Sequence, residues 1–277
     1  MEQSTPGLRF LRRTSDRPPR RFSRGVALLP SLFTVANLFC GYACVVYAMR
    51  GEYETAAPFI GFAIVLDMLD GRIARMTGTA SDFGLQFDSL ADVISFGIAP
   101  AILSFAWGLS SLGRLGWAVG FLFVTAAALR LARFNIQSAA GGDKRYFVGM
   151  PSPAAAGVPA ATVFAYPAGL QDPGEALLGL AMVLLPALLM VSTIRFRSFK
   201  TIDLRTRRPY TVIFLIAAGI MLITTSPQFV LVAMAYTYLA SAFVEMLVIR
   251  IRHRGGRGLS EGGRPDAAVP AQDRATR

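Results

Sequence analysis

Charged residues, histidine and cysteine are all scarce in this sequence. Only 16% of its 277 residues are charged, and its single histidine, His253, lies close to the C-terminus. This scarcity excludes a histidine-based metal or catalytic centre and an ordinary soluble domain. The two cysteines, Cys40 and Cys44, fall in one apolar run. They exclude a disulfide framework, and we expect them to serve as small packing residues.

Long apolar stretches take the place of the missing charge. Hydrophobic residues make up 53% of the chain, and the mean hydropathy is +0.48. A helix needs about 20 apolar residues to cross about 30 Å of hydrocarbon, and runs of this kind recur along the sequence. The pattern predicts an all-α, polytopic membrane helical bundle with eight spans, at residues 32–49, 56–76, 87–107, 115–131, 152–170, 177–194, 210–224 and 230–249.

The distribution of positive charge predicts an orientation for this bundle. Lysine and arginine concentrate in the cytoplasmic loops of membrane proteins. If the N-terminus is cytoplasmic, eight spans leave only Arg50 and Arg114, out of 28 Lys and Arg, in the outer loops. We therefore expect a multi-pass protein of the inner membrane with both termini in the cytoplasm. The net charge of +11 then indicates attraction to anionic headgroups in the lipid bilayer, and no pattern favours nucleic-acid binding.

Composition divides the chain into three parts. Residues 1–26 are rich in arginine and have no continuous apolar core, so they predict a basic arm at the membrane surface rather than a signal peptide. Residues 27–251 hold the apolar runs and form the expected transmembrane catalytic domain. Residues 252–277 are rich in Gly, Arg and Ala without hydrophobic periodicity, which predicts a disordered cytoplasmic tail.

Four aspartates occur where two predicted spans meet. Asp67 and Asp70 lie near the end of the second span, and Asp88 and Asp92 lie at the start of the third. Residues three or four apart share one face of a helix, so each pair presents two carboxylates on one side. Four neighbouring carboxylates repel one another unless cations lie between them, and oxygen ligands suit Mg²⁺, Mn²⁺ or Ca²⁺. The sequence therefore predicts a site for divalent metal ions at this depth.

The spacing of these aspartates is part of a longer motif. Residues 67–92 follow the pattern D-x-x-D-G-x-x-A-R-x8-G-x-x-x-D-x-x-x-D at every fixed position. In this pattern the chain resembles the CDP-alcohol phosphatidyltransferase family. The resemblance implies Asp67, Asp70 and Asp88 as metal ligands and Asp92 as a general base beside the metal. It also implies CDP-lipid contacts from Gly71, Ala74, Arg75 and Gly84, with Asn37 as an additional contact. Taken singly, each of the small residues is explained as well by close helix packing.

The remaining resemblance concerns the acceptor alcohol. Residues 37–41 (NLFCG), 95–100 (SFGIAP), 130–135 (RLARFN) and 151–156 (PSPAAA) are similar to membrane-integral phosphatidylserine synthases of bacteria and archaea. This similarity implies CDP-diacylglycerol as donor, L-serine as acceptor and a homodimer whose active site opens to the cytoplasm. A guanidinium suits a carboxylate, so the expected serine site contains Arg133, Asn135, Lys144 and Ser152.

Two other functions remain open at this point. The same basic residues could bind the phosphate of glycerol 3-phosphate, which would make the chain a phosphatidylglycerophosphate synthase. Carboxylates within a membrane also mark ion carriers and channels. An ion pathway would spread its acids over several spans at mid-depth, whereas here they gather at one depth beside Gly71 and Arg75. The clustering favours an enzyme.

Overall fold

A computed structural model gives the fold of the chain. It describes residues 24–77, 81–139, 146–170, 172–192, 195–197, 214, 217–219, 221–222 and 224–241. Most of the basic arm, all of the predicted tail and most of the predicted seventh span lie outside these residues. The helices and strands are α1 (Arg24–Met49), α2 (Tyr53–Thr77), α3 (Asp82–Val93), η1 (Ile94–Ile98), α4 (Ala99–Trp107), η2 (Leu109–Leu112), α5 (Arg114–Ala139), β1 (Tyr146–Val148), α6 (Ser152–Ala165), α7 (Pro173–Val191) and β2 (Arg195–Arg197).

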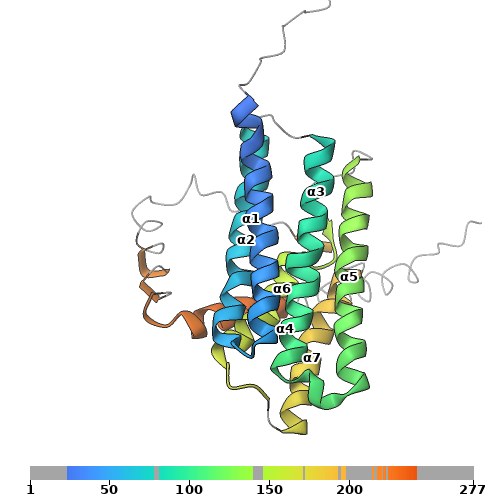
Figure 1. Ribbon diagram of the computed structural model, residues 1–277, viewed down its shortest axis with the longest axis vertical. Coiled ribbons are helices and arrows are strands. Elements are labelled where there is room, and N and C mark those ends of the chain that lie inside the picture. The colour runs from blue at the N-terminus through green and yellow to red at the C-terminus, as the bar shows by residue number, and fades with distance from the viewer. Residues whose placement is uncertain are drawn as a thin grey trace, which may run out of the picture.

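The long helices stand side by side in one bundle (Figure 1). The turns that join α1 to α2 and η2 to α5 lie at one end, with the start of α7, and the end of α2 and the start of α3 lie at the other. The chain thus runs back and forth along one axis, as a polytopic membrane protein does. The end where α2 stops and α3 starts holds the residues of the predicted catalytic motif. We refer to it as the aspartate end.

Four helices in the described part of the chain are long and apolar enough to cross a membrane: 31–49, 82–107, 114–138 and 173–191. They confirm the prediction of an apolar helical membrane protein, whereas the count of eight spans stays a prediction. Helix α2 is 25 residues long but carries Asp67 and Asp70. Large apolar side chains such as Phe39, Phe62 and Phe121 are exposed on the outside of the bundle, as contact with lipid requires.

The bundle interior is filled mainly by small side chains. Ala48, Ala56 and Ala63 are almost completely buried where α1 packs along α2. Small residues let helix backbones approach closely, which is how helices associate in lipid. Cys40 and Cys44 are buried as free thiols in the same core, so the prediction that they serve as packing residues is confirmed.

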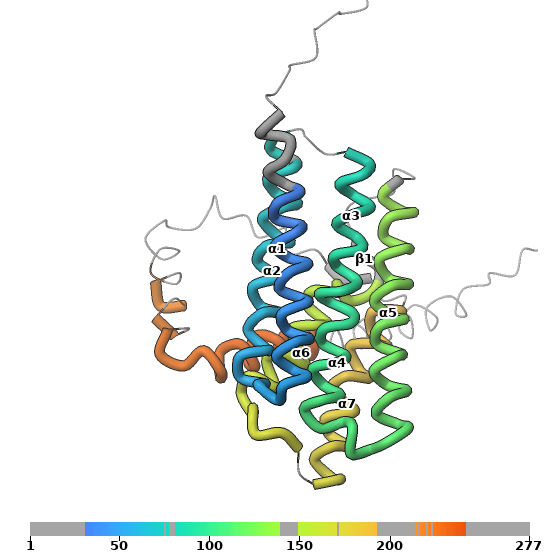
Figure 2. The backbone as a smooth tube through the Cα atoms, viewed as in Figure 1, coloured from blue at the N-terminus to red at the C-terminus, as the bar shows by residue number. Residues whose placement is uncertain are grey.

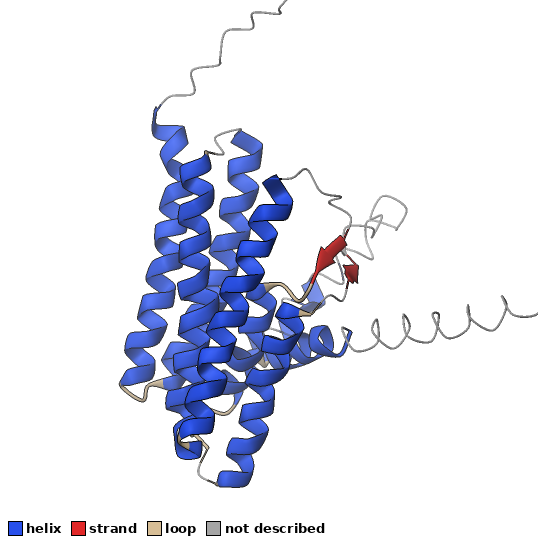
Figure 3. Cartoon of the chain, turned by 90° about the vertical axis from the view of Figure 1, so that its right-hand side faces the viewer, coloured by secondary structure: helices blue, strands red, loops and turns tan. Residues whose placement is uncertain are grey.

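The end of the fifth predicted span was wrong, and one small sheet was not predicted. The fifth predicted span ran to residue 170, but α6 ends at Ala165. Tyr166 precedes Pro167 and leaves the helical conformation, because the proline ring disfavours a helical backbone in the residue before it. The all-α prediction also missed a two-stranded antiparallel sheet beside the helices (Figure 3), in which β1 pairs with β2. This sheet joins the segment before α6 to the segment after α7.

The third predicted span is a continuous path with an irregular centre (Figure 2). Helix α3 leads into the π-helical turn η1 and then into α4. Such π turns widen the backbone locally and occur often at functional sites. Here the turn begins two residues after Asp92, so it lies directly beside one of the predicted catalytic aspartates.

Candidate active site

Three of the four predicted aspartates meet in the bundle interior. One carboxylate oxygen from each of Asp67, Asp88 and Asp92 lies within 4.8 Å of the other two. Asp67 comes from α2, and the other two come from successive turns of α3. We call these three residues the aspartate cluster. Their charges repel one another, and Asp88 Oδ1 is buried with no hydrogen-bond partner among the described residues.

The fourth predicted ligand, Asp70, occupies a different position. Its side chain is only 5% exposed, and one of its carboxylate oxygens accepts a hydrogen bond from the hydroxyl of Thr34 on α1. Asp70 still interacts electrostatically with Asp67 and Asp88. The sequence predicted one cluster of four carboxylates. The structure instead places three in a tight group and the fourth next to it, held by α1.

Helix α1 also supplies a direct contact to Asp92. The side-chain amide of Asn37 donates a 3.2 Å hydrogen bond to Asp92 Oδ1. The backbone carbonyl of Asn37 accepts a 2.9 Å hydrogen bond from the Ser95 hydroxyl in η1. A Cβ at Gly41 would lie 2.6 Å from Ser95 Oγ and 2.8 Å from Ser95 Cα. The close approach of α1 to η1, which positions Asn37 against Asp92, therefore requires glycine at position 41.

A cation lies near the cluster on α5. Arg130 interacts electrostatically with Asp67 and Asp92, although no described carboxylate is within ion-pair distance of it. Its Nη1 donates a 3.4 Å hydrogen bond to the fully buried hydroxyl of Ser152, and its guanidinium lies 5.5 Å from the ring centre of Phe134. These contacts hold the guanidinium on the side of the cluster where α5 and α6 meet.

The other predicted serine-site residues lie farther apart. Arg133 Nη1 donates a 3.3 Å hydrogen bond to the Val191 carbonyl at the C-terminal end of α7. Asn135 donates a 2.8 Å hydrogen bond to the hydroxyl of Ser89, which is next to Asp88 on α3. Lys144 is outside the described residues. Of the predicted set, the structure thus brings Ser152 to Arg130 and Asn135 to α3, while Arg133 contacts a helix end.

The small residues of the motif lie toward the aspartate end. Gly71 is exposed, and Ala74 and Gly84 are half-buried. The Gly84 amide donates a 3.0 Å hydrogen bond to the hydroxyl of Ser81, which caps the start of α3. The Arg75 side chain lies outside the described part of the structure. At these three positions neither helix carries a bulky side chain.

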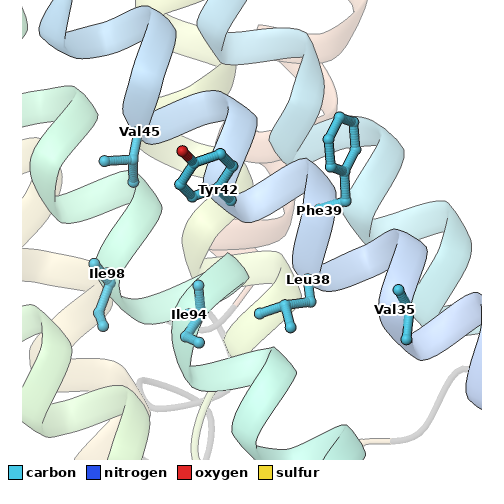
Figure 4. A pocket seen from close by; sticks show the side chains of 7 residues that line it. All are labelled: Val35, Leu38, Phe39, Tyr42, Val45, Ile94 and Ile98. Atoms are coloured by element: carbon cyan, nitrogen blue, oxygen red, sulfur yellow. The ribbon is translucent and has the colours of Figure 1, made fainter.

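An apolar groove runs along the outer side of α1 and η1 (Figure 4). Its volume is about 580 Å³. One end lies beside the site, because Val35 follows Thr34 on α1 and Ile94 is two residues after Asp92. The lining residues are Val35, Leu38, Phe39, Tyr42 and Val45 of α1 together with Ile94 and Ile98 of η1.

Three residues that shape this site were not assigned to it from the sequence: Thr34, Ser95 and Arg130. The signal for Thr34 was its position three residues before Asn37, which puts both on one face of a helix. The sequence alone did not single out Arg130 as a site residue, because an arginine at a cytoplasmic helix end is also explained as an anchor of the span. The role of Ser95 depends on a contact between two helices that no local pattern displays.

Comparison with known proteins shows the family to which the chain belongs. The sequence model of the CDP-alcohol phosphatidyltransferase family matches residues 27–194. A CDP-diacylglycerol–serine O-phosphatidyltransferase of Helicobacter pylori is 41% identical over 181 residues, which cover 63% of this chain and 74% of the relative. The enzyme of the same name from Mycobacterium leprae is 39% identical over 146 residues, covering 51% and 48%. An archaetidylserine synthase of Methanothermobacter thermautotrophicus is 40% identical over 130 residues, covering 46% and 54%. This chain belongs to the CDP-alcohol phosphatidyltransferase family.

Proposed function

We propose that this protein transfers the phosphatidyl group of CDP-diacylglycerol to the hydroxyl of L-serine, which yields phosphatidylserine and CMP. The observation that carries the proposal is the aspartate cluster, in which carboxylate oxygens from α2 and α3 come within 4.8 Å of one another. The names of the H. pylori and M. leprae relatives support serine as the acceptor. The archaeal relative, a synthase of a serine lipid by its name, supports it as well.

The residues of the cluster fit a divalent cation. The donor set is all oxygen, the carboxylates repel one another, and Asp88 Oδ1 lacks a partner among the described residues. Hard ions such as Mg²⁺ or Mn²⁺ prefer such ligands, and Ca²⁺ suits them too. Asp67 and Asp88 would hold the ion, with Asp70 as a further ligand, and Asp92 would lie beside it. When bound, it would neutralise the donor diphosphate and the charge that develops at phosphorus.

Asp92 is the group we assign as general base. Asn37 occupies Asp92 Oδ1, which leaves the second carboxylate oxygen for the acceptor hydroxyl. The described residues include no lysine or histidine, so among them a carboxylate is the base at hand. The serine hydroxyl gives its proton to Asp92 while its oxygen attacks the lipid-linked phosphorus. The bond from that phosphorus to the oxygen of CMP breaks in line, and no covalent enzyme intermediate forms.

The donor lipid has a nucleotide end and an apolar end. We assign the nucleotide to the aspartate end, where Gly71, Ala74 and Gly84 leave space, and the sequence motif adds Arg75 as an expected contact. The groove beside α1 and η1 offers a surface without charged side chains for an acyl chain, and it begins next to the site. In this arrangement the diphosphate lies at the cluster while the lipid tail stays in the hydrocarbon layer.

The position of the enzyme in the cell is part of the proposal. We place it in the inner membrane as a homodimer, with both termini and the aspartate end facing the cytoplasm. The charge distribution supports this orientation. Arg50 and Arg114 are the two basic residues expected in the outer loops, and the turn that begins with Arg50 and the start of α5 at Arg114 lie at the end opposite the aspartate end (Figure 1). Charged, water-soluble substrates would then reach the site from the cytoplasm.

An acceptor panel tests the proposed function. Purified protein receives CDP-diacylglycerol, Mg²⁺ or Mn²⁺, and radiolabelled L-serine, glycerol 3-phosphate or inositol. We expect labelled lipid from serine with an equal amount of CMP, loss of both products after chelation, and recovery when the metal is returned. Lipid from glycerol 3-phosphate but not from serine would make the chain a phosphatidylglycerophosphate synthase. No lipid from any acceptor would contradict transfer altogether.

A further inference from the structure

Two polar groups in the bundle have hydrogen-bonding capacity that the proposed mechanism does not use. They are the side-chain oxygen of Asn37 on α1 and the guanidinium of Arg130 on α5. Among the described residues, the first is a buried acceptor without a donor, and the second is a half-buried cation without a carboxylate partner. Both face the surroundings of Asp92, because Asn37 is hydrogen-bonded to that carboxylate and Arg130 interacts with it electrostatically.

The orientation of Asn37 is fixed by its neighbours. A carboxylate accepts hydrogen bonds, so the atom that faces Asp92 Oδ1 is the amide nitrogen, and Asn37 Oδ1 points elsewhere. The side chain is 0% exposed, and Oδ1 has no hydrogen-bond partner among the described residues. Ser95 donates a hydrogen bond to the backbone carbonyl of Asn37, which holds this turn of α1 against η1. A buried oxygen of this kind is unfavourable unless a ligand donates to it.

Arg130 has several donors left. A guanidinium carries five N–H donors, and the hydrogen bond to Ser152 uses one of them. The contact with Phe134 restricts the plane of the group, and Ser152 is itself fully buried. The position of the guanidinium is therefore set by Ser152 and by Phe134 together. Such a planar, fixed guanidinium recognises a carboxylate through two parallel hydrogen bonds.

We propose that Asn37 and Arg130 recognise the two charged ends of an amino-acid acceptor. Asn37 Oδ1 accepts a hydrogen bond from the acceptor's ammonium, Arg130 binds its carboxylate, and the hydroxyl meets the free oxygen of Asp92. The inference rests on the proposed function and names the acceptor side of that same site. It assigns the carboxylate-binding guanidinium to Arg130 in place of Arg133, whose Nη1 is bonded to the Val191 carbonyl.

Serine analogues that lack one charged group test the two contacts separately. Ethanolamine lacks the carboxylate, and 3-hydroxypropanoate lacks the ammonium. The value kcat/KM is measured for serine and both analogues in the wild type and in the variants Arg130→Gln, Arg133→Gln and Asn37→Ala. Ratios between acceptors are compared, since a general loss of activity cancels in a ratio. Arg114→Gln, the same change at the distant start of α5, is the matched control.

We expect Arg130→Gln to raise the serine KM about ten- to a hundredfold, the effect of one lost charged hydrogen bond, with little change for ethanolamine. Asn37→Ala should lower kcat for every acceptor, because Asp92 loses its donor. It should also reduce the preference for serine over 3-hydroxypropanoate. Arg130→Lys keeps the charge and should restore part of the preference for serine over ethanolamine.

Three outcomes would overturn the inference. One is an unchanged serine-to-ethanolamine ratio in Arg130→Gln, and another is the loss of that ratio in Arg133→Gln instead. The third is an unchanged serine-to-3-hydroxypropanoate ratio in Asn37→Ala. Activity toward ethanolamine shows that the Arg130→Gln variant is folded. If that variant does not fold, Ser152→Ala tests the same guanidinium, because it removes the hydroxyl to which Arg130 donates a hydrogen bond. A wild type that makes no lipid from serine contradicts the proposed function itself, which keeps the two failures distinct.

Discussion

Replacing Gly41 by alanine should lower turnover strongly, although Gly41 itself contacts no substrate group in the proposed mechanism. The added Cβ would lie 2.6 Å from Ser95 Oγ and 2.8 Å from Ser95 Cα. A normal contact is about 3.5–4 Å, so α1 and η1 would have to separate by about 1 Å. Ser95 Cα is backbone, so rotation of a side chain cannot relieve this overlap. The separation would move Asn37 away from Asp92, which it meets at 3.2 Å.

The size of the effect follows from that displacement. A misplacement of about 1 Å in a catalytic group can cost about a hundredfold in rate. Overpacking of a tight interface costs about 1–3 kcal/mol of stability. We therefore expect Gly41→Ala to lower kcat about a hundredfold and to lower the thermal unfolding temperature moderately, with a small change in the KM for the donor lipid.

A matched glycine serves as the control for this experiment. Gly61 lies in the neighbouring helix α2, and a Cβ there would meet nothing within 4 Å. Gly61→Ala should keep wild-type turnover and gain slightly in stability, because alanine favours helix by about 1 kcal/mol over glycine. Steady-state turnover and thermal unfolding are measured for both variants in the same detergent. Wild-type turnover in Gly41→Ala would refute the idea that the contact between α1 and η1 positions the base.

Three further predictions test other parts of the site. Asp92→Asn should lower kcat about 10²- to 10⁴-fold while CDP binding is nearly retained, since the new amide oxygen can still accept a hydrogen bond from Asn37. Asp88→Asn should weaken metal-dependent CDP binding in a metal titration. Equal behaviour of the two variants would remove the distinction between base and ligand. Leu38→Trp should fill the groove beside α1 and raise the KM for long-chain CDP-diacylglycerol more than for a short-chain analogue, and equal shifts would mean that no acyl chain lies there. An accessibility reporter at Glu52 should be extracytoplasmic and one at Gly141 cytoplasmic; a cytoplasmic Glu52 would reverse the proposed orientation.

Much of the fold was predictable from the sequence because apolar length is a local property. A run of apolar residues that can span the hydrocarbon layer is visible residue by residue, and the first four predicted spans all correspond to helices or helical paths. The end of α6 at Ala165 was missed because apolar residues continue past the point where Pro167 disfavours the helix. The β1–β2 pair was missed because its partners are far apart in the chain.

The sequence by itself determined the family and predicted a group of four carboxylates. The spacing of the aspartates places Asp67 with Asp70 and Asp88 with Asp92 on shared helix faces, and the structure brings three of these four carboxylates into one cluster. Only the tertiary structure decided that Asp70 pairs with Thr34, that Asn37 holds Asp92, and that Arg130 rather than Arg133 approaches the cluster. Those relations depend on the rotation and separation of α1, α3 and α5. Rotation and separation arise from contacts between helices, such as that of Gly41 with Ser95, and no local pattern in the sequence encodes them.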